Sequence, residues 1–163
     1  RELRDHGNDT TDNKAVFFYH MAQSVLKFKP PVNIFGNIVG NDSEADELNL
    51  DIKKILFPVI SFLRLYSIRE KISGNNSMER AGLLLSEKVI DHETYEEITQ
   101  AWSFLTLLRL RSQVQSITQN EAPGNLINLN ELSRIEQSTL KKIFSGVSEL
   151  QTQVGFDFKG TET

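Results

Sequence analysis

Two arginines interrupt the most apolar helical stretch of the chain, in the sequence Leu-Leu-Arg-Leu-Arg-Ser-Gln at residues 107–113. A guanidinium group matches phosphate and carboxylate oxygens with paired hydrogen bonds, so Arg109 and Arg111 are candidates for contacting a nucleotide or an acidic ligand. Gln113 follows Arg109 by one helical turn and is a third candidate. The alternative is structural. In this alternative, Arg109 is expected to be mostly buried. Because burying an arginine is costly unless it is paired, it is also expected to be bonded to a carboxylate of another helix.

Further cations and the expected acidic partners lie in the segment Leu50–Ile72. Lys53 and Arg64 are candidates for a basic surface that faces a nucleotide or a partner, although such residues on long helices are more often only solvated. Asp51 and Glu70 are the expected partners of Arg109. The choice between ligand contact and structural pairing depends on where these side chains point.

The sequence lacks the residue patterns of a complete active site. None of the nine glycines is followed by serine and no two aspartates lie two residues apart, so a Gly-Ser phosphate turn and an Asp-x-Asp magnesium pair are both missing. The histidines have no histidine or cysteine four residues away, and no Gly-x-Ser-x-Gly pattern occurs. We therefore expect no catalytic residue, no metal site and no bound cofactor in this chain.

Length, charge and cysteine content limit the class of protein further. A chain of 163 residues fits one domain. The absence of cysteine suits a reducing compartment and predicts a cytoplasmic location. No apolar run approaches the roughly 18 residues that cross a bilayer. A net charge of −4 spread over both signs argues against nucleic acid as a partner. The polar N-terminus without methionine suggests part of a longer protein.

Apolar periodicity and capping residues predict an all-α fold, an antiparallel bundle of four to five principal helices within residues 12–154. Residues 1–11 are expected to be a linker or tail from a preceding domain, and residues 155–163 a C-terminal tail. The segment 32–47 reads as an ordered loop, with a short strand pair as the alternative. The predicted helices begin at Asp12, Leu50, Ser77, Glu93 after an Asp91 cap, and the Ser133 capping box.

Two of these predicted helices carry specific expectations. The helix of about residues 93–119 is apolar in every direction between Ala101 and Leu110, so it is expected to be the centre of the bundle. The helix that begins at Leu50 contains Pro58, which is expected to kink it or to split it in two.

Several segments in order resemble one known family. They are Phe17…Met21-Ala22, Pro30-Pro31-Val32, Phe35-Gly36-Asn37, Leu50-Asp51-Ile52-Lys53, Arg64-Leu65-Tyr66, Glu79-Arg80, Leu108 to Gln113 and Asn125…Ile127…Leu132-Ser133. This order is similar to the putative nucleotidyltransferase substrate-binding domain. The arginine segment is also similar to the helical region that follows the catalytic domain in glutamine-synthetase adenylyltransferases. This sequence departs from the shared pattern at Gly36 and Ser112.

The resemblance implies a helical bundle at the C-terminal end of a bacterial signal-transduction protein. Such proteins also carry a pair of CBS domains and a nucleotidyltransferase domain like that of PII-protein uridylyltransferase. Those preceding domains would be partners of this chain, together with a protein substrate. Mg²⁺ and a nucleoside triphosphate would belong to the parent enzyme. The competing hypothesis is a helical interaction or dimerisation module with purely structural arginines, and a homodimer fits either reading.

Overall fold

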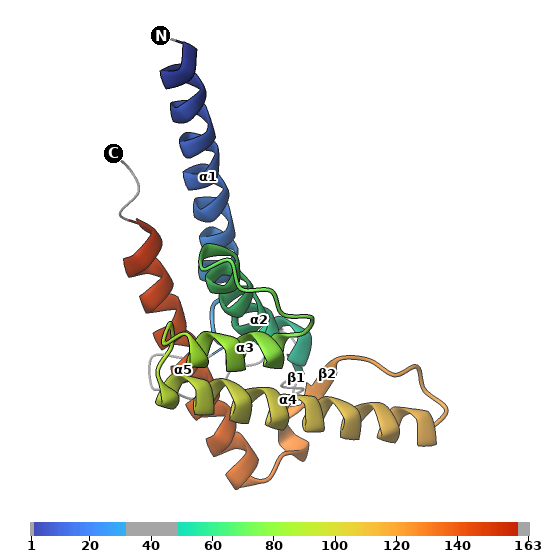
Figure 1. Ribbon diagram of the computed structural model, residues 1–163. Helices are drawn as coiled ribbons and strands as arrows, with labels where there is room; N and C mark the ends of the chain where they lie inside the picture. The colour runs from blue at the N-terminus through green and yellow to red at the C-terminus, as the bar shows by residue number, and fades with distance from the viewer. Residues whose placement is uncertain (1, 32–48, 160–163) are drawn as a thin grey trace.

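The computed structural model describes residues 2–31 and 49–159, with side chains for residues 14–31 and 49–158. This part of the chain holds five α-helices: α1 (Glu2–Leu26), α2 (Ile52–Arg69), α3 (Ser77–Ser86), α4 (His92–Thr118) and α5 (Arg134–Lys159). Figure 1 shows α1 and α5 running in opposite directions, and the first half of α1 projecting beyond the other helices. The prediction of an all-α helical bundle is confirmed.

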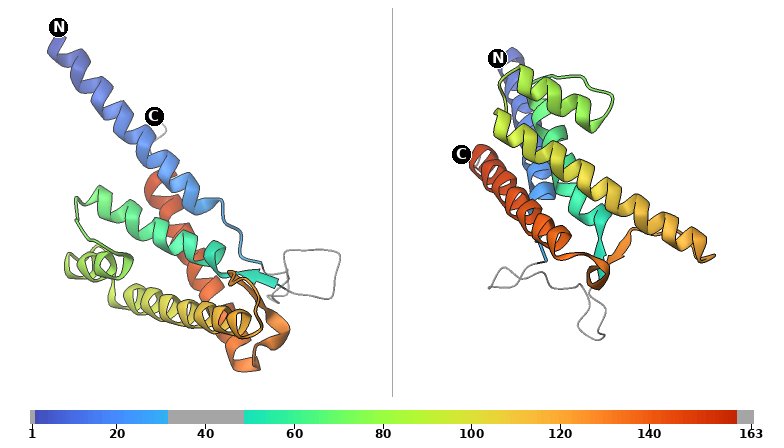
Figure 2. Two further views of the ribbon diagram at one scale, coloured as in Figure 1. Left: turned by 90° about the vertical axis from the view of Figure 1, so that its right-hand side faces the viewer. Right: turned by 90° about the horizontal axis from the view of Figure 1, so that it is seen from below.

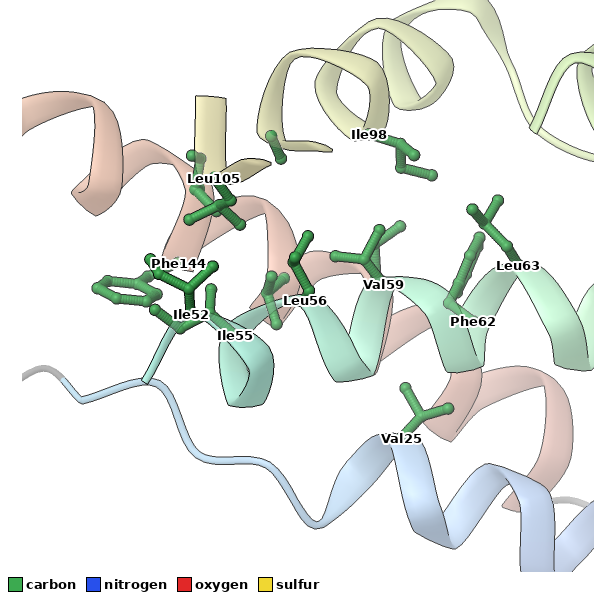
Figure 3. Packing of buried hydrophobic residues seen from close by; sticks show 14 of the residues in the cluster. Val25, Ile52, Ile55, Leu56, Val59, Phe62, Leu63, Ile98, Leu105 and Phe144 are labelled. Atoms are coloured by element: carbon green, nitrogen blue, oxygen red, sulfur yellow. The ribbon is translucent and has the colours of Figure 1, made fainter. Parts of the chain in front are cut away.

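Helix α2 is the centre of the bundle. Over half of its residues are buried, and it packs against each of the other four helices. Figure 3 shows α2 between α1 and α4, with Val25 on α1 facing it from one side and Ile98 on α4 from the other. Pro58 lies inside this helix, which continues across it as one element, so the helix is not split.

The prediction that the 93–119 helix is the centre is wrong. Only four residues of α4 are buried, and they all lie in its first two thirds: Ile98, Ala101, Leu105 and Leu108. The last part of α4 extends beyond the body of the domain (Figures 1 and 2), so the apolar side chains there meet solvent and not other helices. Four of them, Leu107, Leu110, Val114 and Ile117, are 54–65% exposed.

A two-stranded antiparallel sheet forms between two segments that were predicted to be the start of a helix and a loop. Strand β1 (Asn49–Asp51) pairs with strand β2 (Leu126–Asn128), with Leu50 opposite Ile127. Both of these apolar side chains are buried. A short 3₁₀ turn (Leu129–Glu131) follows β2. The strand pair considered within residues 32–47 lies outside the described residues.

The predicted starts of α4 and α5 agree with the structure, and each carries the predicted cap. The side chain of Asp91 accepts a hydrogen bond from the Thr94 amide at the start of α4. At the start of α5, the amide of Ser133 donates to Glu136 and the Ser133 hydroxyl accepts from the Glu136 amide, which is the predicted capping box. Helix α3 is capped one residue earlier than predicted, by Asn76.

Both ends of the chain are more helical than the sequence indicated. Helix α1 begins at Glu2 and not at Asp12. Helix α5 continues through Gly155 to Lys159 because Phe158 is buried and its ring packs against Tyr66. No helix in the described part of the chain is long and apolar enough to cross a membrane.

Candidate functional site

The arginine segment of α4 holds the connection that leads through β2 to α5. Arg111 donates to Glu136 at 2.6 Å, and the same carboxylate closes the capping box of α5. The Ser112 hydroxyl donates to the carbonyl of Leu126, and the Gln113 amide donates to the carbonyl of Gly124. The hydrogen bonds from Ser133, together with Arg111, hold the pKa of Glu136 below its usual value. These contacts join α4 to the segment that connects it with α5.

Arg109 lacks the carboxylate partner that the sequence predicted. Its side chain is half-buried, and its Nε is buried with no hydrogen-bond partner among the described residues. The two expected partners are engaged elsewhere, since Asp51 accepts from the Lys53 amide to cap α2 and Glu70 accepts from Arg69. The predicted pairing of Arg109 with Asp51 or Glu70 is therefore wrong.

Among the cavities that the described residues line, none brings the five candidate contact residues together. Lys53 and Arg64 are exposed on α2. Among the described cavities, Arg111 lines one of only about 20 Å³ beside β2. The role of these residues as ligand contacts stays a prediction. The described part of the chain also contains no group of three His, Asp or Glu side chains that could hold a metal ion.

The connection between α3 and α4 lines a cavity of about 670 Å³. A smaller cavity with an apolar floor lies in a groove between α4 and α5 above α2. It has a volume of about 160 Å³. Apolar side chains from all three helices form its floor: Val59, Ile98, Ala101, Ile143, Val147 and Leu150. Figure 3 shows Val59 and Ile98 on the facing sides of α2 and α4. Polar side chains of Glu97, Gln100, Thr139 and Lys142 complete the lining, so an apolar floor meets a polar mouth.

Gly146 of α5 helps to keep this groove open. A Cβ built at Gly146 would stand 3.5 Å from the Glu97 carboxylate and meet no closer atom. The small side chain of Ala101 lines the groove from α4. Bulkier residues at either position would extend into the space between the two helices, so the groove depends on these small residues.

Glu97 is the carboxylate at the groove mouth, and further carboxylates lie near it. Burial raises the pKa of Glu97 above its usual value, and the nearby charges of Glu149, Glu93 and Asp91 raise it further. Lys142 is the cation among the lining residues. The mouth near Glu97 is thus a place where a positive charge is favoured and a phosphate is repelled.

Comparison with protein families gives the class to which this helical body belongs. Residues 15–158 match the family described as "Putative nucleotidyltransferase substrate binding domain". The match covers α2, α3, α4, both strands and every residue of the groove, together with α1 from residue 15 and α5 up to Phe158, so the chain belongs to this family. Neither the curated proteins nor the solved structures that we compared gave a significant match.

The groove was not predicted from the sequence, because the candidate residues were chosen mainly among cations. Glu97, Ala101 and Gly146 carry no motif, and a glycine within a periodic helix was interpreted only as destabilising. One signal was available. Small residues at positions of otherwise large apolar helices indicate either close helix contact or an open space between helices, and here they accompany an open space.

Proposed function

We propose that this chain is the non-catalytic, substrate-binding domain of a bacterial nucleotidyltransferase of the PII-uridylyltransferase type, in a cytoplasmic signal-transduction protein that also carries CBS domains. The observation that carries this proposal is the family match over residues 15–158. In this proposal the domain holds the acceptor, while Mg²⁺ and the nucleoside triphosphate are bound by the preceding catalytic domain.

The geometry supports binding of an acceptor better than phosphate binding by the predicted cations. Arg111 and Gln113 are already bonded within the domain, whereas the α4–α5 groove offers an open apolar floor. Apolar clefts with a few polar groups at the mouth are typical ligand sites. We therefore place acceptor binding at this groove.

The test compares the full-length protein with a form that lacks this domain, using labelled nucleoside triphosphates and Mg²⁺. Loss of the domain is expected to raise the KM for the acceptor or to abolish its labelling. Binding of a fluorescent nucleotide to the catalytic domain should be unchanged, and the 163-residue chain alone should transfer no label. The proposal fails if the chain alone transfers label, or if the acceptor KM is the same without the domain.

A second candidate function is self-association through α4. The exposed residues Leu107, Leu110, Val114 and Ile117 follow one another at steps of three, four and three residues, the spacing of a coiled-coil seam. No charged residue occurs from Ser112 to Asn120, so two copies would meet no like charges along the second half of this stripe, whereas Arg111 flanks its first half. The molar mass of the full-length protein at rising concentration, with and without Val114→Glu, decides between a monomer and a dimer.

A further inference from the structure

The chemistry of the α4–α5 groove specifies which part of the reaction it serves. Its volume of about 160 Å³ resembles an aliphatic cavity of about 150 Å³, which holds a benzene-sized group. One aromatic or branched side chain fills such a space. Of a nucleotide, only the base would fit this space, so its ribose and phosphates would lie at the mouth of the groove.

The charges around the mouth favour a cationic protein segment over a nucleotide. A nucleoside triphosphate brings several negative charges, and at this mouth it would meet the carboxylate of Glu97, which already lies near the charges of Glu149 and Glu93, with Lys142 as the lining cation. A lysine or arginine would instead gain a carboxylate partner at Glu97, whose carboxylate lies beside the groove at Gly146. Complementary charge selects between ligands even where it adds little affinity.

We infer that the groove binds a segment of the protein acceptor in which an apolar side chain, aromatic or branched aliphatic, stands next to a lysine or arginine. This inference rests on the proposed function. The apolar side chain lies on the floor formed by Val59, Ile98 and Val147, and the neighbouring cation meets Glu97 at the mouth. The nucleotide does not enter this groove.

Two blocked tetrapeptides serve as probes: acetyl-Ala-Phe-Arg-Ala-amide and its counterpart with Glu in place of Arg. Each is titrated into the ¹⁵N-labelled 163-residue chain, and amide shifts are followed by NMR. The Phe-Arg peptide is expected to shift the amides of Ile98, Ala101 and Val147. The Phe-Glu peptide is expected to bind about threefold to tenfold more weakly, as suits a partly exposed ion pair together with the neighbouring carboxylates. Glu97→Gln should reduce this preference.

A matched pair of glycine variants separates a blocked groove from a damaged fold. Gly146→Leu places a side chain at the groove, whereas Gly82→Leu lies in α3 where an added Cβ meets nothing within 4 Å. Both changes replace a helical glycine with a strong helix former, so both are expected to keep or raise the melting temperature. Peptide binding should fall at least tenfold in Gly146→Leu and stay unchanged in Gly82→Leu.

Three results would overturn the inference: no shift at the groove amides at millimolar Phe-Arg peptide, equal binding of the two peptides, or shifts of the same amides by ATP or UTP. These results are distinct from failure of the proposed function. If removal of the domain raises the acceptor KM but the peptide does not bind, only the groove assignment fails. If the peptide binds but removal leaves the KM unchanged, the proposed function fails.

Discussion

The hydroxyl of Tyr66 and the carboxylate of Asp157 join the end of α2 to the end of α5, and their hydrogen bond should be measurable in stability. Tyr66 is fully buried and its hydroxyl donates to Asp157 Oδ2 at 2.5 Å. Arg69 adds a weaker contact to the same oxygen at 3.4 Å and lies over the Tyr66 ring. Burial and the neighbouring carboxylate raise the pKa of Tyr66, so it stays a neutral donor at any ordinary pH.

The expected magnitudes follow from what each substitution leaves behind. Tyr66→Phe removes a hydrogen bond to a charged acceptor, worth about 1.5–3 kcal/mol in general. Because the Asp157 side chain is 26% exposed and can be rehydrated, we expect a loss of about 1–2 kcal/mol. Asp157→Ala removes the charged acceptor of the buried hydroxyl, leaving the Gln153 side chain beside it, and also removes the Arg69 contact, so about 2–3 kcal/mol should be lost. Asp157→Asn keeps an acceptor and should cost about 1 kcal/mol or less.

Urea unfolding followed by far-ultraviolet circular dichroism measures these differences, provided that the slope of the transition stays constant. The double variant Tyr66→Phe/Asp157→Ala should be no less stable than Asp157→Ala alone, since it no longer contains a stranded hydroxyl. Arg111→Ala, which breaks a more exposed pair, is the control and should cost about 0–1 kcal/mol. If Tyr66→Phe unfolds like the wild type, or Asp157→Asn is as damaging as Asp157→Ala, the reasoning is wrong.

Two further predictions concern single charged residues. Glu97 has a raised pKa in the fold, so its ionised form opposes folding; Glu97→Gln should raise the free energy of unfolding at pH 7. That gain should shrink as the pH falls through the folded-state pKa and vanish below the ordinary value, and a pH-independent gain in urea titrations would contradict the cause given. Arg109→Met removes a buried, unpartnered Nε while keeping the length of the side chain, so the free energy of unfolding should stay within about 1 kcal/mol of the wild type or rise. A loss above about 2 kcal/mol would show that the guanidinium is paired.

Local features of the fold were predictable from sequence, and features set by distant contacts were not. The Asp91 cap and the Ser133–Glu136 capping box depend on residues three positions apart, and both appear as expected. The pairing of Leu50 with Ile127 joins strands of three residues each, which are too short to show an alternating pattern. Helix α5 reaches Lys159 because Phe158 packs against Tyr66, a contact that local composition cannot indicate.

The error over α4 has a similar cause. Apolar periodicity reports which side chains avoid water, but not which surface covers them. For Leu105 that surface is the core, whereas Leu107 and Leu110 remain exposed on the described part of the chain. The prediction that α4 is the centre assumed that the buried and the exposed apolar side chains were all covered by other helices. The sequence of α2, with buried residues around most of its circumference, fits the central position that it occupies.

The position of Arg111 explains why the arginine segment of α4 is a weak indicator of a phosphate site in this domain. To bind a phosphate, Arg111 must release Glu136 or share its guanidinium with it, and Glu136 stays in place because the Ser133 amide also donates to it. One charge-assisted bond would replace another, beside a carboxylate that repels the phosphate. The net gain is small. The α4–α5 groove requires no such exchange, because a side chain that enters it displaces water from apolar atoms and breaks no ion pair.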